Sequence, residues 1–150
     1  MFRGFDVLVG YAPIGDEPDY GAFLKESGIS KLGISILSDR TISHEAFAES
    51  LMRLYAGKKV CIFVPGRKFD SAGTRHGRGG GWYDRFLSAV PREWVRVGVL
   101  NASQLSSHTL KREPWDEPMD MLLIRENESW KKIECRERDS NSQGVAPARF

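Results

Sequence analysis

The chain contains one stretch, residues 64–89, in which a short apolar run, a glycine-rich basic loop and an amphipathic segment follow one another directly. The apolar run predicts a strand that ends at Val64, and the apolar spacing from Trp82 onward predicts a helix that Pro91 terminates. Glycine lets backbone N–H groups approach a ligand because it has no Cβ. This order of strand, glycine loop and helix favours an open α/β fold, with the loop at the carboxyl end of the sheet, where such folds bind ligands.

The rest of the chain repeats the alternation of short apolar runs and amphipathic segments, which is typical of an open, mostly parallel sheet flanked by helices. The expected strands are residues 7–11, 32–37, 59–64, 95–100 and 119–125, with a polar strand at 130–135. The expected helices are residues 20–26, residues 44–55 and a third that begins at residue 82. In the second helix, Ser43 caps the start and the apolar face is expected to consist of Phe47, Leu51, Leu54 and Tyr55.

Length and charge point to a single globular domain without a broad charged surface. The 150 residues are expected to form one α/β domain over residues 1–136, followed by a disordered tail over 137–150. The net charge of +2 gives no reason to expect a nucleic-acid or membrane surface. No apolar stretch is long enough to be a secretory signal or to span a bilayer. Cys61 lies in an apolar run and is expected to be a buried free thiol, so we expect a cytoplasmic protein.

The glycine-rich loop carries the charge and the backbone freedom that an anion site needs. Residues 67–85 hold five Lys/Arg against two Asp. Arginine presents planar donors to phosphate, and a helix N-terminus adds N–H groups and the positive end of a dipole. The candidate phosphate-binding residues are Arg75, His76, Gly77, Arg78, Gly79, Gly80, Gly81, Trp82 and Tyr83. The same composition is also typical of a solvated connector, and neither G-x-x-x-x-G-K-[ST] nor G-x-G-x-x-G is present.

The string VPGRKFDSAGTRHGRGGGWYDRFL resembles the signature of the 5-formyltetrahydrofolate cyclo-ligase family, also called the 5,10-methenyltetrahydrofolate synthetases. That signature reads approximately V-P-G-x-x-F-D-x-x-G-x-R-x-G-x-G-x-G-Y-Y-D-x-x-L. The residues in register are Val64, Pro65, Gly66, Phe69, Asp70, Gly73, Arg75, Gly77, Gly79, Gly81, Tyr83, Asp84 and Leu87. Trp82 stands in place of the first tyrosine and keeps an aromatic face.

The resemblance implies an enzyme and a reaction. The reaction is the ATP- and magnesium-dependent cyclisation of 5-formyltetrahydrofolate to 5,10-methenyltetrahydrofolate, with release of ADP and phosphate. The loop N–H groups, Arg75 and Arg78 are implied to bind the ATP phosphates, and Arg78 and Tyr83 to act in catalysis. Trp82 and Tyr83 are implied to pack against the pterin or the adenine.

Three carboxylates are implied to complete the site. Asp84 follows the loop directly, and Asp116 matches the first aspartate of the family's x-H-D-x-x-x-D stretch, with Trp115 in place of the histidine, so both are implied to bind Mg²⁺. Glu17 matches the family's Y-x-P-x-x-x-E-V-D-T segment and is implied to bind folate. Without the resemblance, Asp84 is better explained as a first-turn residue that complements the helix dipole, and the other two fit solvated acidic turns.

The resemblance is incomplete at the N-terminus. Family members usually begin with a basic helix, and this chain is expected to be a shortened member without it. Three functions therefore stay open: the cyclo-ligase, a weak or inactive relative that binds folate or nucleotide, and an anion- or nucleic-acid-binding module that uses the Arg/Gly loop. A wide basic face and stacking platforms are lacking, so no nucleic acid is expected as a partner. The protein is expected to be a monomer or a homodimer.

Overall fold

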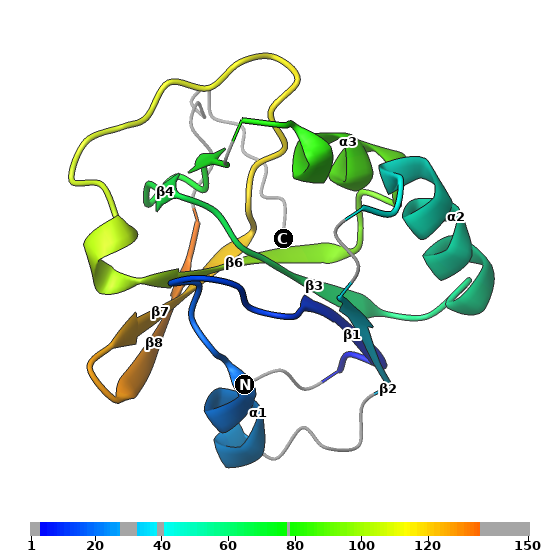
Figure 1. Cartoon of the computed structure of the whole chain (residues 1–150), viewed down its shortest axis with the longest axis horizontal. Coiled ribbons are helices and arrows are strands. Elements are labelled where there is room, and N and C mark those ends of the chain that lie inside the picture. The colour runs from blue at the N-terminus through cyan, green and yellow to red at the C-terminus, as the bar shows by residue number, and fades with distance from the viewer. Residues whose placement is uncertain (1–3, 28–32, 39–40, 78, 136–150) are drawn as a thin grey trace.

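A computed structural model of the chain describes residues 4–27, 33–38, 41–77 and 79–135, and it has the predicted α/β fold (Figure 1). The main strands are β1 (Val7–Tyr11), β2 (Gly33–Leu37), β3 (Val60–Val64), β6 (Val95–Asn101), β7 (Met121–Glu126) and β8 (Ser129–Glu134). They form one sheet of six strands in the order β2-β1-β3-β6-β7-β8. All neighbouring pairs are parallel except β7 and β8, which are antiparallel. The predicted open, mostly parallel sheet is confirmed, and the polar strand expected near its end is β8.

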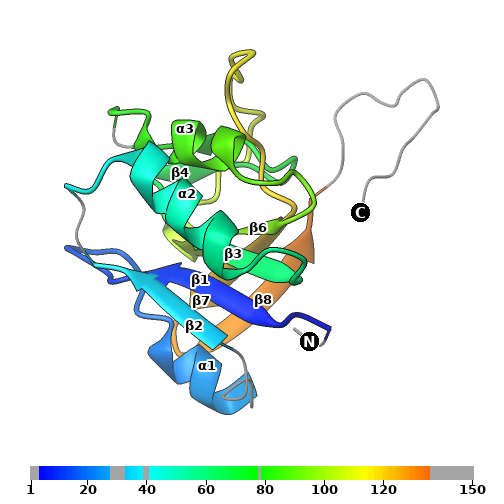
Figure 2. The same ribbon diagram turned by 90° about the vertical axis from the view of Figure 1, so that its right-hand side faces the viewer.

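Helices cover both faces of the sheet. The helices α2 (His44–Leu54) and α3 (Trp82–Ala89) lie on one face, and α1 (Gly21–Ser27) lies on the other (Figures 1 and 2). Burial on both faces explains why β1 and β3 are apolar at almost every position and buried along their whole length. Each face has its own hydrophobic cluster: Leu51 and Phe86 belong to the first and Phe23 to the second.

Helix α2 begins as predicted but buries a different set of residues. The Ser43 hydroxyl accepts a hydrogen bond from the Ala46 N–H at 3.0 Å, which confirms the predicted N-cap. The expectation that Leu54 lies on the apolar face is wrong, since this side chain is 65% exposed. The helix ends at Leu54, and the next residue, Tyr55, reaches the sheet instead, where its hydroxyl lies 2.6 Å from the hydroxyl of Ser35.

A short hairpin within the glycine-rich stretch was not predicted. It consists of β4 (Lys68–Phe69) and β5 (Arg75–His76), which pair antiparallel. Its turn is organised by the buried carboxylate of Asp70, whose Oδ1 accepts hydrogen bonds from the N–H groups of Ala72 and Thr74 at 3.0 and 2.9 Å. A turn closed by a side-chain acceptor and flanked by two-residue strands is too short to leave a periodic pattern in the sequence, which is why the hairpin was not predicted.

The segment before β7 is held by backbone hydrogen bonds to the hairpin turn and to β6, and β7 begins two residues later than predicted. The Met119 N–H donates to the Gly73 carbonyl at 2.8 Å, and the Asp120 N–H donates to the Arg96 carbonyl at 2.8 Å. A short 3-10 helix, η1 (Ala102–Gln104), follows β6. Its Gln104 side chain donates to the Gly66 carbonyl at 2.8 Å and so links the end of β6 to the start of the glycine-rich stretch.

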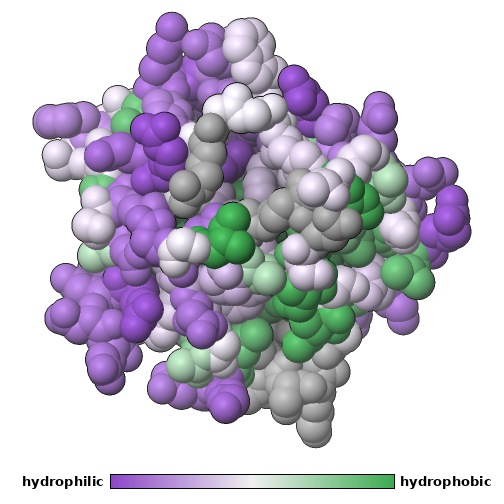
Figure 3. Space-filling view, viewed as in Figure 1, coloured by the Kyte–Doolittle hydropathy of each residue, from purple (hydrophilic) through white to green (hydrophobic). Residues whose placement is uncertain are grey.

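The face of the molecule seen in Figure 1 is mainly hydrophilic (Figure 3), and both cysteines are buried, as was predicted for Cys61. The hydrophobic side chains of this face gather in patches near the middle of the view (Figure 3). Cys61 and Cys135 are both buried free thiols, and burial raises the pKa of each. Within the described residues, no helix has the length and apolar character needed to cross a membrane. The predicted disordered tail, residues 137–150, lies outside the described residues.

Candidate active site

A cleft of about 450 Å³ opens at the carboxyl ends of β1, β2 and β3. It lies where the position of the glycine-rich connection predicted a ligand site. The lining residues are Glu17, Leu37, Pro65, Gly66, Arg75, His76, Gly77, Gly79, Gly80, Gly81, Trp82, Tyr83, Asp84, Trp115 and Asp116. Every candidate site residue from the sequence is among them except Arg78, which lies outside the described residues.

Three consecutive glycines, residues 79–81, form the rim of the cleft. Gly79 and Gly81 have left-handed φ values of 106° and 72°. No atom of the described residues lies within 4 Å of the place where a Cβ would stand on Gly79 or Gly80. Gly81 is the N-cap of α3 and provides no side chain to accept the first N–H groups of the helix. Among the described residues, no side chain caps the first N–H groups of α3, and the positive end of its dipole lies at the cleft, which is the usual geometry for holding an anion.

The floor of the cleft contains a buried cation. The Arg75 side chain is 5% exposed, its Nη1 donates to the Pro65 carbonyl at 2.9 Å, and its guanidinium lies 5.4 Å from the centroid of the Tyr83 ring. Burial lowers the pKa of Arg75, while the nearby Asp84, Tyr83 and Asp116 oppose that shift. Its Nε has no hydrogen-bond partner among the described residues. Arg75 thus places fixed positive charge beside two carboxylates, and its contact with ATP phosphates stays a prediction.

Two aspartates come together from different parts of the chain. Asp84 lies in the first turn of α3, and its Oδ1 accepts a hydrogen bond from the Glu117 N–H at 3.1 Å. The Oδ2 of Asp116 accepts one from the Glu113 N–H at 2.8 Å. Burial raises the pKa of Asp84, and the negative charges of Asp116 and Glu117 add to the rise, against the opposing effect of Arg75 and the Glu117 hydrogen bond. A half-buried carboxylate beside another carboxylate gains from an added cation.

The donor set matches what a magnesium ion uses. The described residues contain no group of three or more His, Cys, Asp or Glu side chains that could enclose a metal ion by themselves. Mg²⁺, however, is commonly held by one or two carboxylates and completes its shell with phosphate oxygens and water. Asp84 and Asp116 therefore fit a magnesium ion that arrives with a phosphate chain, and this role stays a prediction.

The far wall of the cleft comes from the segment that follows β1. Glu17 is buried, with 9% exposure, and its Oε1 accepts a hydrogen bond from the Ile14 N–H at 3.0 Å. The Asp16 carbonyl accepts from the Asn101 side chain at 3.2 Å, which ties this segment to the end of β6. Leu37, at the end of β2, lines the cleft as well. Glu17 thus brings a carboxylate to the site, and its binding of folate stays a prediction.

The aromatic residues at the start of α3 differ in how firmly they are held. The Trp82 indole N–H donates to the Ile42 carbonyl at 2.9 Å, and its ring stacks on Phe86 at a centroid distance of 5.3 Å. Trp82 therefore packs with α2 and α3 as well as lining the cleft. Trp115 is 67% exposed and also lines it. Trp115 was predicted only to replace the family's histidine, and its place in the site was missed. The signal was its position next to Asp116, which also lines the cleft.

Contacts that the sequence did not predict hold residues 106–118 against the hairpin. Asp70 Oδ2 accepts a hydrogen bond from the Leu110 N–H at 2.8 Å, and Arg112 Nε donates to the Thr74 hydroxyl at 3.1 Å. The Nε2 of His76 lies 2.8 Å from the Lys111 carbonyl. His76 is thus a member of β5 that ties two segments together, and its predicted contact with ATP is untested. These contacts bring Asp116 to the cleft although it lies more than thirty residues after Asp84.

The fold and the cleft define an α/β protein in which a glycine-rich connection from strand to helix meets a pair of carboxylates. Residues 39–125 match the model of the 5-formyltetrahydrofolate cyclo-ligase family, and the chain belongs to that family. The resemblance seen in the sequence is therefore confirmed.

Two curated relatives carry the name 5-formyltetrahydrofolate cyclo-ligase. One, from Mycoplasma genitalium, is 33% identical over 63 residues, which cover 42% of this chain and 37% of that protein. The other, from Mycoplasma pneumoniae, is 25% identical over 118 residues, which cover 75% of this chain and 69% of that protein. A solved structure described as a 5,10-methenyltetrahydrofolate synthetase from Mycoplasma pneumoniae has a TM-score of 0.55 and 21% identity, covering 80% of this chain and 72% of its own. At that identity the structural likeness supports the fold alone.

Proposed function

We propose that the chain catalyses the ATP- and magnesium-dependent cyclisation of 5-formyltetrahydrofolate to 5,10-methenyltetrahydrofolate, with release of ADP and phosphate. The observation that carries the proposal is the meeting, in one cleft, of the open glycine rim at residues 79–81 with Asp84 and Asp116. The rim leaves room and donors for a phosphate chain, and the carboxylates suit the cation that accompanies it. Membership of the family and the names of its relatives support the same reaction.

In the proposed reaction, the formyl oxygen of the substrate attacks the γ-phosphorus of ATP, and the bond between that phosphorus and ADP breaks. The anilino nitrogen then attacks the activated formyl carbon and loses its proton. The carbon–oxygen bond to phosphate breaks, and phosphate leaves as the ring closes. Little of this chemistry needs a protein nucleophile, so catalysis rests on positioning and on stabilising charge.

The residues of the cleft have separate roles in this proposal. The N–H groups of residues 79–82 hold the phosphates, with Arg75 adding fixed positive charge beneath them. Tyr83 and Arg78, the latter outside the described residues, act on the transferred group. Asp84 and Asp116 hold Mg²⁺, which when bound neutralises charge on the phosphate oxygens. At the other end, Glu17 accepts hydrogen bonds from the amino and amide groups of the pterin, and Trp115 offers an exposed aromatic face.

A second candidate is a relative that binds folate or nucleotide with weak or no turnover. It is favoured by one observation: among the described residues that line the cleft, Arg75 is the sole Lys or Arg, and its Nη1 is already bonded to the Pro65 carbonyl. A shortage of accessible cations weakens phosphate binding, since each hydrogen bond to a charged group contributes about 1.5–3 kcal/mol.

The test is a turnover assay that follows the methenyl product by its absorbance, with 5-formyltetrahydrofolate, ATP and Mg²⁺. Wild-type protein is expected to form product, and Asp84→Asn to lose at least about 100-fold in rate, near 2.7 kcal/mol. Asp6→Asn is the matched control. Like Asp84, Asp6 accepts a hydrogen bond from a backbone N–H, that of Lys59, at 2.9 Å. Asp6 is exposed and lies at the opposite end of the sheet, just before β1. Stabilisation by folate or ATP without product would favour the second candidate.

A further inference from the structure

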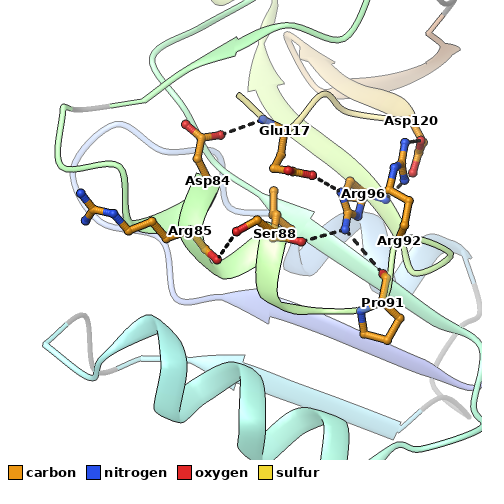
Figure 4. A network of polar contacts seen from close by, with 9 residues as sticks. Asp84, Arg85, Ser88, Pro91, Arg92, Arg96, Glu117 and Asp120 are labelled. Carbon is orange, nitrogen blue, oxygen red and sulfur yellow. Dashed lines mark hydrogen bonds and ion pairs between the residues drawn. The ribbon is translucent and has the colours of Figure 1, made fainter. Parts of the chain in front are cut away.

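Arg96 is the largest fully buried side chain of the described residues and lies on strand β6, in the middle of the sheet (Figure 4). Its Nη1 donates to Oε1 of Glu117 at 3.0 Å. Its Nη2 donates to the Leu87 carbonyl at 2.9 Å and lies 3.5 Å from the Pro91 carbonyl. One guanidinium therefore binds both the C-terminal end of α3 and the segment that precedes β7.

This arrangement is costly as a device for stability alone. Burial lowers the pKa of Arg96, as does the neighbouring charge of Arg92, while Glu117 and Asp120 oppose the shift. The Nε of Arg96 has no hydrogen-bond partner among the described residues. A buried ion pair is often no more stabilising than well-packed apolar residues of the same volume, because desolvation offsets the attraction. The pair of Arg96 and Glu117 does, however, fix geometry, since its hydrogen bonds are directional.

What the pair fixes is the relation between the two carboxylates of the cleft. The backbone N–H of Glu117 donates to Asp84 Oδ1, and Glu117 directly follows Asp116 in the chain. Asp84 lies one turn before Leu87 on α3. The bond from Arg96 to the Leu87 carbonyl thus lies within one helical turn of Asp84. The bond from Arg96 to Glu117 lies one residue from Asp116, and Figure 4 shows Glu117 between Arg96 and Asp84.

We propose that Arg96 and Glu117 are positioning residues that set the distance between the Asp84 and Asp116 carboxylates, and thereby the affinity and selectivity of the cleft for a divalent cation bound to nucleotide phosphates. The inference rests on the proposed function, since it concerns the same cation site. Mg²⁺ demands near-ideal octahedral geometry, whereas Ca²⁺ tolerates longer and more irregular contacts. A frame that holds two carboxylates rigidly therefore favours Mg²⁺ over Ca²⁺.

The test measures calorimetric binding of ADP in three forms: with Mg²⁺, with Ca²⁺ and without a divalent cation. Glu117→Ala removes the acceptor for Arg96 but leaves the backbone N–H that reaches Asp84. It is expected to weaken Mg–ADP binding about tenfold, to weaken Ca–ADP binding less, and to leave metal-free ADP binding unchanged. Glu117→Gln keeps an acceptor oxygen and is expected to restore most of the affinity. If the alanine variant does not fold, Glu117→Asp, which shortens the side chain by one methylene, is compared with Glu117→Gln in the same way.

The matched control is Glu49→Ala, which breaks an exposed ion pair with Arg53 on α2, 3.1 Å long, and is expected to change none of these affinities. Equal losses for metal-free ADP and Mg–ADP, or an unchanged ratio of Mg²⁺ to Ca²⁺ affinity in the folded variants, would overturn the positioning role while leaving the proposed function in place. Absence of Mg–ADP binding by the wild-type protein would overturn both.

Discussion

The glycines of residues 66–77 and those of residues 79–81 belong to one glycine-rich stretch but meet different surroundings. A Cβ on Gly73 would overlap the Met119 carbonyl oxygen, and one on Gly77 would lie 2.8 Å from Nη1 of Arg75. On Gly80 it would meet no atom of the described residues within 4 Å. The first set of glycines is thus required because protein atoms come close. The second borders open space in the cleft.

This difference separates the part of the glycine-rich stretch that builds the fold from the part that faces the cleft. The hairpin β4–β5 and the segment before β7 approach each other through Gly73, which allows the Met119 N–H to reach the Gly73 carbonyl. Nothing in the described protein explains the absence of a side chain at Gly80. A glycine with a free Cβ position beside a cleft is what close approach of a ligand to the backbone requires. Substitutions at the two kinds of glycine should therefore affect different measurements.

The largest expected effect on stability is that of Gly73→Ala. The new Cβ meets backbone that cannot move away, and the φ of 97° is unfavourable for alanine, so the free energy of unfolding should fall by about 3 kcal/mol. Urea denaturation measures this. Gly57→Ala is the matched control, because Gly57 has a φ of 76° but no described atom within 4 Å, and it should cost only about 1 kcal/mol. Equal losses in the two variants would show that overlap at Gly73 is unimportant.

A smaller loss is expected for Gly77→Ala. Here the new Cβ meets the flexible end of Arg75, which can shift at the expense of its hydrogen bond to the Pro65 carbonyl. We expect the free energy of unfolding to fall by about 1 kcal/mol, the typical net value of one hydrogen bond. Urea denaturation of both glycine variants under one set of conditions gives the ranking. A loss as large as that of Gly73→Ala would mean that Arg75 is held rigidly.

The Asp84 carboxylate is expected to reduce the stability of the ligand-free protein slightly at neutral pH. Its pKa is raised in the folded state, mainly by burial, so the contribution of Asp84 to stability is fully present below the unfolded-state pKa and is lost as the pH rises through the folded-state pKa. Asp84→Asn should therefore raise the melting temperature at pH 7 by about 1 °C, a small value because solvent screens a half-buried charge.

Thermal melts of wild-type and Asp84→Asn protein between acidic and neutral pH test this sign. The advantage of the variant should shrink as the pH falls and the wild-type carboxyl becomes protonated. A variant that is less stable than wild type at pH 7 would indicate that the interaction of Asp84 with the α3 dipole outweighs the cost of its burial.

Apolar patterns and capping signals were sufficient to predict the main strands, their mostly parallel arrangement and the three helices, because most of these elements contribute apolar side chains to the two hydrophobic clusters. The boundaries failed where a contact outside the element decides them. Met119 and Asp120, expected to begin β7, bond instead to Gly73 and Arg96. At the end of α2, Tyr55 contacts Ser35 of the sheet while Leu54 stays exposed. Such contacts join residues far apart in the chain, which a local pattern cannot register.

Most residues that line the cleft could be predicted, but the buried charged residues that hold the neighbouring segments in place could not. The string after Val64, the aspartate after Trp115 and Glu17 were enough to name most of the residues that line the cleft; Arg78 lies outside the described residues. The roles of Asp70, Arg112 and Arg96 in holding the surrounding segments in place could not be predicted, because charged residues are usually exposed and their burial depends on partners distant in sequence.

The most direct test of the division within the glycine-rich stretch uses Gly80→Ala, for which the structure predicts the smallest change in stability. The free energy of unfolding should stay within about 0.5 kcal/mol of wild type. Calorimetric titration of the same variant with ATP and Mg²⁺ should show at least about a tenfold loss of affinity, near 1.4 kcal/mol, because the methyl group occupies space needed by the phosphates. Wild-type affinity in a normally folded Gly80→Ala protein would contradict the claim that this rim holds a nucleotide.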